Sequence, residues 1–325
     1  MQQEIRFATF NAYNLAPAGE KLYDNLAPLT AEQYEAKLNW TAQQLDLLDA
    51  DVIGFQEIFS QAVLREVLAR TRLYRQAAHT GFDPDPAAER LTPSVALVSR
   101  LPLAGPARSY TAFPDGVLLP PGSRDAERFA RAPLHAGVVL PDGSVVDVVV
   151  VHLKSRRPDY RNGDDGNDAL LYAMANLRSL IRRGTEAVAL RVLLAQLARE
   201  RPSVVLGDFN DVVDAVTTAI VLGAGAACEP GQEWRGRLFD CNQIQLRQDR
   251  LRHVGYTSMH DGHYMTIDHI LVSEQFHRAS PHAIGEVLDV TYLNDHLLQA
   301  RDGASDHGQV LARIRLYGER RGQDR

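Results

Sequence analysis

The segment Ser203-Val204-Val205-Leu206-Gly207-Asp208-Phe209-Asn210-Asp211 decides the fold class of this 325-residue chain. Its apolar residues 204–206 predict a short buried strand, and the strand ends in polar residues that a core would not accommodate. A long helical stretch over about residues 169–199 precedes it and is stopped by Pro202. A helix followed at once by a buried strand is typical of the α/β class.

Other apolar segments of the chain also end in, or begin with, polar residues. The strands expected at residues 5–10, 51–55 and 145–151 are each followed by such a residue, and the late strands begin next to others. These residues are Asn11, Glu57, His152, Asp208 with Asn210, Asp268, and Asp306 with His307. Six strand termini of this kind predict one convergent site at one edge of a sheet.

The remaining pattern predicts a single domain over residues 1–317 and a disordered tail over 318–325. Strands are expected at 94–99, 136–140, 264–272 and 310–316, and helices at 62–69 and after a capping box formed by Thr30 and Gln33. Asp261-Gly262 predicts a hairpin turn. No repeat or low-complexity linker divides the chain.

The composition indicates in which cellular compartment the protein is expected. Hydrophobic residues make up 45% of the chain and charged residues 23%, yet no apolar run approaches the roughly 20 residues of a membrane span. The start lacks a basic and apolar leader pattern, and Cys228 and Cys241 cannot form a disulfide framework. We therefore expect a monomer in the reducing cytoplasm, although a chain whose leader had been removed, from a secreted or periplasmic protein, would look the same.

The charge distribution is uneven. The net charge of -6 argues against binding nucleic acid by bulk electrostatics. Residues 154–201, however, hold ten basic and six acidic residues, so this segment is +4 and the rest of the chain is -10. A second basic cluster contains Arg247, Arg250, Arg252 and His253. The loops expected at 76–93 and 155–168 are candidates for the rim of the site.

The residue types at the strand ends indicate a reaction class. Carboxylate and amide oxygens are hard donors that suit Mg²⁺ or Mn²⁺, with Ca²⁺ as an alternative. His152 and His307 are available for proton transfer or for hydrogen bonds to substrate oxygens. No G-x-S-x-G nucleophile pattern is present. Together these features predict metal-assisted attack of water on a phosphate ester.

At this point the sequence resembles the endonuclease/exonuclease/phosphatase superfamily, which includes pancreatic DNase, abasic-site endonucleases, neutral sphingomyelinases and inositol polyphosphate 5-phosphatases. The resemblance extends from Thr9-Phe10-Asn11 to Ser305-Asp306-His307. It includes the motifs Gln56-Glu57, His152-Leu153-Lys154-Ser155, Gly207-Asp208-Phe209-Asn210 and Ile267-Asp268-His269. It implies a DNase I-like four-layered α/β/β/α sandwich of two packed mixed sheets, with the site at one end, and the His-Leu-Lys-Ser motif is similar to bacterial nuclease-like members.

The resemblance also implies roles for individual residues. Glu57 matches the principal metal ligand, and Asn11 and Asp306 match further residues at the metal. Asp208 matches the aspartate that orients or deprotonates water, and Asn210 the amide that binds phosphate. The histidine that contacts the scissile phosphate is matched by His307, with Asp268 as its partner, and His152 matches a second histidine. Arg131 and Lys154 are the candidates for additional phosphate contacts.

Three other features have plainer interpretations. His269 is expected to pack on the strand face opposite Asp268. His260 and His263 flank the predicted hairpin turn, where a solvated cross-strand pair is favoured over a zinc site because no third ligand is evident. The acidic run over residues 162–168 lacks the spacing of a calcium-binding loop.

Three hypotheses remain for the function. A metal-dependent nuclease is favoured by the basic residues that follow His152 and is opposed by the net charge and the lack of evident stacking aromatics. A phosphodiesterase or phosphatase for a small or lipid-linked ester, similar to a sphingomyelinase or an inositol phosphatase, fits the confined positive charge. A non-catalytic scaffold fits poorly, because the set of polar strand ends is complete. We predict a phosphodiester hydrolase, with nuclease activity as the leading case.

Overall fold

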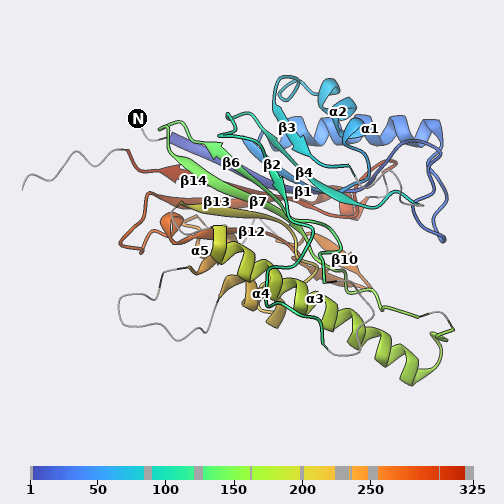
Figure 1. Ribbon diagram of the computed structural model, residues 1–325. Helices are drawn as coiled ribbons and strands as arrows, with labels where there is room; N and C mark the ends of the chain where they lie inside the picture. The colour runs from blue at the N-terminus through green and yellow to red at the C-terminus, as the bar shows by residue number, and fades with distance from the viewer. Residues whose placement is uncertain are drawn as a thin grey trace, which may run out of the picture.

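The computed structural model describes residues 3–83, 90–120, 127–161, 163–197, 201–223, 234, 236–247, 255–299 and 301–318. Cys228, Arg250, Arg252 and His253 lie outside these ranges, as does all of the expected tail except Gly318. Figure 1 shows two sheets that pack on each other, with helices on both outer faces. No helix within the described ranges is both long and apolar enough to cross a membrane.

The first sheet has six strands in the order β13-β14-β1-β2-β4-β3. They are β1 (Gln3–Leu15), β2 (Val52–Ile58), β3 (Ala78–Gly81), β4 (Ser94–Ser99), β13 (Gly285–Leu293) and β14 (Gln309–Leu316). The sheet is mixed, because β1 runs parallel to β2 and antiparallel to β14.

The second sheet has the order β5-β6-β7-β8-β12-β9. Its strands are β5 (Arg108–Ser109), β6 (Leu134–Val139), β7 (Val145–His152), β8 (Ser203–Asp208), β9 (Leu238–Asp240) and β12 (Asp268–Ser273). Only β7 and β8 pair in parallel. The apolar run of β7 is explained by burial on both faces, because Val148 and Val150 pack between the sheets while Val149 and Val151 face the helices.

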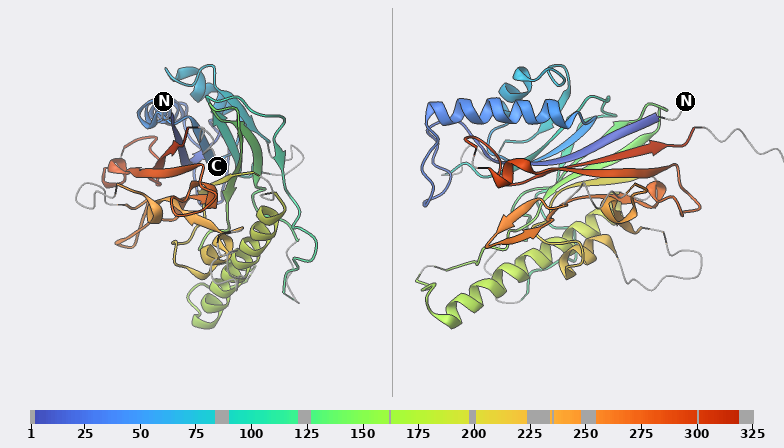
Figure 2. Two further views of the ribbon diagram at one scale, coloured as in Figure 1. Left: turned by 90° about the vertical axis from the view of Figure 1, so that its left-hand side faces the viewer. Right: turned by 180° about the vertical axis from the view of Figure 1, so that it is seen from behind.

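The helices complete four layers, as the resemblance implied. The helices α1 (Ala31–Leu48) and α2 (Gln61–Arg70) cover the first sheet, and α3 (Ala169–Leu197) and α4 (Val216–Leu222) cover the second (Figure 2). The short elements are α5 (Cys241–Ile244), η1 (Glu274–Phe276) and η2 (Asp295–Leu298). One apolar core lies between the sheets, and one lies under each helical layer.

Most of the helices, strands and turns predicted from local sequence patterns are present in the structure. The capping box of Thr30 and Gln33 begins α1, and the turn at Asp261 joins β10 (Ser258–His260) to β11 (His263–Met265). The single strand expected over 264–272 is wrong, because the chain leaves the hairpin after Met265 and enters β12 only at Asp268. Between them the backbone N–H of Ile267 donates to Thr257 Oγ1 at 3.0 Å, which turns the chain into the sheet.

A close approach between the sheets brings the site strands together. A side chain at Gly54 of β2 would place its Cβ 2.8 Å from Leu206 Cβ of β8 and 3.1 Å from Val150 of β7. Only glycine allows this contact without displacing the opposite sheet. The ends of β2, β7 and β8, which carry Glu57, His152 and Asp208, therefore reach the same end of the sandwich.

Candidate active site

Three predicted residues stand side by side at the end of the second sheet. The strand register pairs His152 of β7 with Asp208 of β8, and Asp208 with Asp268 of β12. All three side chains are buried. His152 Nε2 lies 3.4 Å from Asp208 Oδ2. Two carboxylates and an imidazole are thus placed next to one another by backbone pairing alone.

His307 completes this group from the turn before β14. Its Nδ1 lies 2.8 Å from Asp268 Oδ2, and its Nε2 lies 3.9 Å from Asp208 Oδ2. Burial by itself would lower the pKa of His307, but the carboxylates of Asp268, Asp208 and Asp306 raise it well above its usual value. The carboxylates therefore favour the protonated ring, and Asp268 fixes its orientation.

Asp208 lies at the centre of the site. Its Oδ1 accepts a hydrogen bond from the Asn210 backbone N–H at 2.8 Å, and its Oδ2 accepts one from Asn11 Nδ2 at 3.1 Å. Burial and the neighbouring charge of Asp268 raise the pKa of Asp208 to about 7. A carboxylate with such a pKa is suited to accept a proton near neutral pH.

The first sheet contributes Asn11 and Glu57. Asn11 Nδ2 lies 3.4 Å from Glu57 Oε1, and the backbone N–H of Asn14 donates to Glu57 Oε2 at 2.9 Å. The pairing of β1 with β2 is irregular after Asn11, and Tyr13, Asn14 and Glu57 all have positive φ angles, 50°, 56° and 59°. Left-handed backbone at three non-glycine residues is costly and clusters at functional sites.

Asp306 and Lys37 lie on the same side of the site. The Asp306 side chain is 56% exposed, and one of its oxygens lies 4.0 Å from His307 Nε2. Lys37 of α1 is only 3% exposed, and burial lowers its pKa to about 8 although Asp306 and Glu57 oppose the change. Sequence reasoning missed Lys37. Its position three residues after Tyr34, within the apolar stripe of α1, was the signal that it faces inward.

The polar atoms at this end fit a divalent cation. Glu57 and Asp306 repel each other, Asp268 Oδ1 is buried without a hydrogen-bond partner, and every candidate ligand except the histidines offers a hard oxygen. Asp208, Asp268 and His307 form a compact group whose ligand atoms lie within 4.8 Å of one another. The Nδ1 contact with Asp268 leaves Nε2 as the ring nitrogen that could bind a metal, but the neighbouring carboxylates raise the pKa of His307, and protonation competes with metal binding.

Two of the predicted phosphate-binding residues, Asn210 and Arg131, contact the same backbone carbonyl, whereas Lys154 points elsewhere. Asn210 and Arg131 both bind the carbonyl of Leu153, through Nδ2 at 3.0 Å and Nη1 at 3.2 Å, directly after His152 in the chain. Lys154 was expected on the same strand face as His152, but β7 ends at His152. The Lys154 Nζ lies 3.2 Å from the Ser155 carbonyl and 3.5 Å from Ser179 Oγ of α3. Its amine therefore contacts α3 and its own loop.

Two arginines of the basic segment 154–201, Arg156 and Arg183, are engaged by one aspartate. Arg156 and Arg183 both pair with Asp211, which also accepts a hydrogen bond from Thr217 Oγ1 at 2.7 Å. Glu186 of α3 is buried and accepts hydrogen bonds from the backbone N–H groups of Ala130 at 3.0 Å and Lys154 at 2.9 Å. These charges hold loops against α3.

The other polar features have structural partners. His269 is buried, with Nδ1 3.0 Å from Asp240 Oδ2 and Nε2 3.0 Å from the Asp211 carbonyl. His260 and His263 are the expected exposed cross-strand pair. In the acidic run, Asp168 Oδ1 accepts from the backbone N–H groups of Leu170 and Leu171, both at 2.9 Å, at the start of α3. Asn162 of that run lies outside the described residues.

Sequence reasoning also overlooked two polar groups that shape the site. Ser305 Oγ donates to the Asn11 carbonyl at 2.7 Å and accepts from the His307 N–H at 3.0 Å, so it ties the end of β1 to the turn that carries His307. The β10–β11 hairpin lies beside His307, because Ser258 forms a β-bridge with it. Tyr264 of this hairpin is 57% exposed.

The fold and the site define a DNase I-like α/β sandwich whose polar groups gather at one end of two mixed sheets. The chain belongs to the Endonuclease/Exonuclease/phosphatase family, whose profile matches residues 8–307. Members of this family hydrolyse phosphate esters and generally use divalent metals. No curated protein sequence matches the chain.

Solved structures show the same fold at low sequence identity. An endonuclease/exonuclease/phosphatase from Bacteroides vulgatus has a TM-score of 0.60 at 16% identity, covering 97% of this chain and 100% of the other. A mannosyl-6-phosphatase from Bacteroides thetaiotaomicron has a TM-score of 0.58 at 14% identity, covering 95% and 99%. D. rerio TDP2, complexed with single-strand DNA product, has a TM-score of 0.57 at 14% identity, covering 96% and 98%.

Proposed function

We propose that this protein hydrolyses a small phosphodiester by metal-assisted attack of water. The observation that carries the proposal is the group of Asp208, Asp268 and His307, in which His307 Nε2 lies 3.9 Å from Asp208 Oδ2 and the pKa values of both groups are raised. No arginine or lysine of the described ranges forms an ion pair with Asp208, Asp268, Glu57 or Asp306. The charges of Glu57 and Asp306 are therefore available to a metal cation, whereas Asp268 is held by His307.

Each residue has a role that its contacts support. Asp208 takes the proton of the attacking water, and His307 donates a hydrogen bond to the phosphoryl group and the departing oxygen. Asn11, Glu57 and Asp306 would hold a Mg²⁺ or Mn²⁺ ion, which supplies neutralisation of the phosphate charge. Asn210 and Arg131 border the same space. His152 stays uncharged, because burial and then Arg131 and His307 lower its pKa well below the usual value, and the neutral ring offers one N–H to the substrate.

A small substrate is favoured over a polymer by the state of the basic segment. A nucleic acid is held by side chains that are free to neutralise successive phosphates. Arg156 and Arg183 are instead engaged by Asp211, and Lys154 is turned toward α3. Among the described residues, these three side chains are therefore less available to successive phosphates than the sequence suggested.

A nuclease remains the second candidate, because one specific feature favours it. Tyr264 and Met259 are both exposed on the hairpin beside His307, where a base could stack. The TDP2 structure with single-strand DNA product shows that this fold accommodates DNA in another protein.

One parallel assay separates these candidates. Plasmid DNA, RNA, bis-p-nitrophenyl phosphate and p-nitrophenyl phosphate are incubated with the protein and Mg²⁺ or Mn²⁺, with EDTA as the control. We expect turnover of the small diester that exceeds turnover of both polymers and of the monoester. Efficient cleavage of DNA or RNA that falls steeply with added salt would favour the nuclease, and preference for the monoester would favour a phosphatase.

A further inference from the structure

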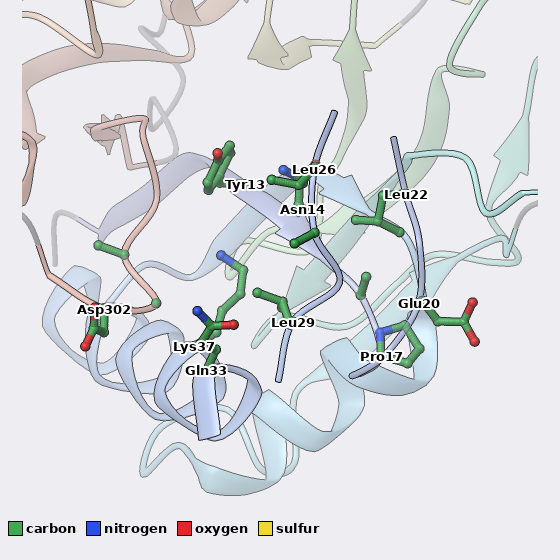
Figure 3. A pocket seen from close by; sticks show the side chains of 14 residues that line it. Tyr13, Asn14, Pro17, Glu20, Leu22, Leu26, Leu29, Gln33, Lys37 and Asp302 are labelled. Atoms are coloured by element: carbon green, nitrogen blue, oxygen red, sulfur yellow. The ribbon is translucent and has the colours of Figure 1, made fainter. Parts of the chain in front are cut away.

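An open pocket lies directly beside the proposed metal ligands. It measures about 690 Å³ including its mouth and is bordered by the segment between β1 and α1 and by the N-terminal half of α1 (Figure 3). Its apolar wall contains Leu22, Leu26 and Leu29. Tyr13 and Asn14 form the side next to Glu57, whose carboxylate the Asn14 N–H binds. A pocket of this size suits part of a small molecule.

Lys37 is the unusual member of the lining. The residue is only 3% exposed, and its Nζ forms no hydrogen bond or ion pair with any residue in the described part of the chain. Its one contact of this kind is with the Tyr13 ring, whose centroid is 5.3 Å away. Figure 3 shows the ammonium group pointing into the pocket, toward Tyr13 and Asn14. Because the ammonium opens on the pocket and has no acceptor among the described side chains, water or an oxygen of a bound ligand must accept its hydrogen bonds.

We propose that this pocket binds the alcohol half of the substrate, with apolar carbons against Leu22, Leu26 and Leu29 and an anionic oxygen on the Lys37 ammonium. The inference rests on the proposed function, because it assigns the phosphate to the neighbouring site. The negative charges that act on Lys37 are those of Asp306 and Glu57, and both carboxylates are assigned to the cation. With their charge engaged there, the ammonium is left for the ligand. The substrate class is therefore a phosphate ester of an apolar alcohol that carries a second anionic group.

Binding of non-hydrolysable probes tests this assignment. The probes are methylphosphonate, benzylphosphonate, 4-(phosphonomethyl)benzoate and 1,4-phenylenebis(methylphosphonate), each as the methyl ester of one phosphonate group so that it mimics a phosphodiester, titrated calorimetrically at neutral pH with Mg²⁺ present. Benzylphosphonate should bind about tenfold more tightly than methylphosphonate, because the ring is removed from water. The added carboxylate or the added phosphonate should each increase the affinity about tenfold over benzylphosphonate. The probe that binds more tightly indicates whether the second anionic group of the substrate is a carboxylate or a phosphate.

Variants separate the two halves of the pocket. Lys37→Met should abolish the advantage of the added anion while keeping that of the ring, and Leu29→Ser should reduce the advantage of the ring. Lys21→Met is the matched control, because Lys21 lies in the same segment, is 58% exposed and pairs with Asp24. Lys37→Met should also unfold at a higher temperature than the wild type, since an unpaired buried charge is removed.

Equal affinity for the three aromatic probes, or an anion advantage that survives Lys37→Met, would overturn the proposal. A lower unfolding temperature of Lys37→Met with unchanged probe binding would do the same and would assign Lys37 a structural role. Binding as expected, with no hydrolysis of any ester in the assay panel, would contradict the proposed function while leaving the pocket assignment in place.

A second inference comes independently from the outer face of α3. Its first half is reversed relative to an ordinary amphipathic helix, because Arg182, Arg183 and Glu186 are buried while large apolar side chains face outward. These form the α3 stripe, with exposed fractions of 69%, 41%, 46%, 38% and 39% for Leu170, Met174, Leu177, Ile181 and Val188. The helix lies at the outer edge of the molecule in Figures 1 and 2.

The spacing of the α3 stripe fits a helix pair. Steps of four and three residues lead from Leu170 to Ile181 and continue through Gly184 to Val188, which is the repeat of a two-stranded coiled coil. A side chain at Gly184 would meet nothing within 4 Å. Antiparallel pairing of two copies sets Leu170 against Val188, Leu177 against Ile181, and Met174 against the open space at Gly184 of the partner subunit.

We infer that two copies of this chain associate through their α3 stripes in this antiparallel register, in contrast to the monomer expected from the sequence. The stripe and the adjacent Leu180 expose on the order of 500 Å² per copy, so two copies bury about 1,000 Å², the lower limit of a specific interface. A lipid surface fits less well, because a helix that lies on a membrane carries basic residues beside its apolar face. The exposed residues of α3 within the described ranges are uncharged.

Light scattering during gel filtration measures the association. The wild type should be a dimer, Ile181→Glu a monomer, and Tyr172→Glu a dimer, because Tyr172 is equally exposed on α3 but lies off the stripe. Gly184→Leu should weaken the dimer by filling the space for Met174, and adding Met174→Ala should restore it. A monomeric wild type, or a dimer unaffected by both Ile181→Glu and Gly184→Leu, would overturn the inference. Monomers that bind anionic vesicles would assign the stripe to lipid.

Discussion

Asp208 and Asp211 lie three residues apart and are both buried, yet their surroundings differ completely. Asp211 is surrounded by Arg156, Arg183 and Thr217, and although burial opposes the change, these groups lower its pKa. Asp208 faces Asp268 and two histidines without an arginine or lysine partner in the described ranges, and burial raises its pKa to about 7. One carboxylate is satisfied within the protein, and the other is left to react.

The difference distinguishes structural charge from functional charge. Fully paired groups such as Asp211 and Glu186 hold the loops after β7 and β8 against α3. Carboxylates that have no arginine or lysine partner among the described residues gather at the end of the sandwich, with strained backbone at Glu57 and Asn210, whose φ angles are 59° and 53°. A fold retains such costs where binding or chemistry requires them.

The largest effect is expected at the predicted metal ligands. Chelation, or Glu57→Gln, should lower turnover by about three orders of magnitude, because the neutralising charge beside the phosphate is lost. Mg²⁺ should raise the unfolding temperature of the wild type and fail to do so for Glu57→Gln. Glu35→Gln is the control, since Glu35 is exposed and paired with Arg70. Full turnover of chelated protein would contradict the metal assignment.

A smaller effect is expected within the His307–Asp268 pair. His307→Ala should lower kcat by about a thousandfold because the donor to the phosphoryl group is removed. Asp268→Asn disturbs only orientation and protonation, so about 10- to 100-fold is expected. Steady-state rates on the preferred ester measure both. A larger loss in Asp268→Asn than in His307→Ala would reassign Asp268 to direct contact with the metal or water.

The pair formed by His269 and Asp240 should affect stability rather than turnover. Both ring nitrogens of His269 face acceptors, so both carry protons, and Asp240 raises the pKa of His269 although burial opposes this. A raised folded-state pKa stabilises the fold fully below the unfolded value of 6.5, and the benefit is lost as the pH rises through the folded pKa. Urea unfolding should therefore show that the destabilisation caused by Asp240→Asn shrinks toward alkaline pH. A difference that does not depend on pH would contradict the charged pair.

The smallest effect is expected at Lys154. Its ammonium is satisfied by Ser155, Arg157 and Ser179, so Lys154→Ala should change kcat/KM by less than about twofold. Rates at several salt concentrations should fall on the wild-type curve. A loss of DNA cleavage together with a reduced salt dependence would return Lys154 to the substrate interface.

Strand periodicity and motif order made much of the fold and site predictable. The fold class, both helical layers and the convergence of six strand ends were accessible, because packing alone does not place Asp or His at the end of a buried strand. The direction of the Lys154 side chain could not be predicted, because β7 ends at His152 and the alternation of strand faces does not extend to Lys154. The partnerless Lys37 was also hidden, since helical spacing shows that a lysine faces inward but not what it meets there.

The remaining differences come from tertiary contacts. The strand expected over 264–272 is interrupted because Thr257, ten residues earlier, captures the Ile267 N–H. The left-handed backbone of Glu57 has no local signature, since the neighbouring strands impose it. The pairing of the basic segment depends on Asp211 meeting Arg183 from α3, a contact between residues 28 positions apart.

The comparison of Asp208→Asn with Asp211→Asn tests the central claim most directly. For each variant, kcat on the preferred ester and the free energy of unfolding in urea are measured on the same preparation. Asp208→Asn should lower kcat by about 10²- to 10⁴-fold, because the base is lost. This variant should remain at least as stable as the wild type, because the repulsion between the buried carboxylates of Asp208 and Asp268 is removed. Asp211→Asn should lose about 2 kcal/mol of stability and keep most of its turnover, because two arginines lose their partner. Two variants with the same profile, or with the profiles exchanged, would contradict the distinction between reactive and structural charge.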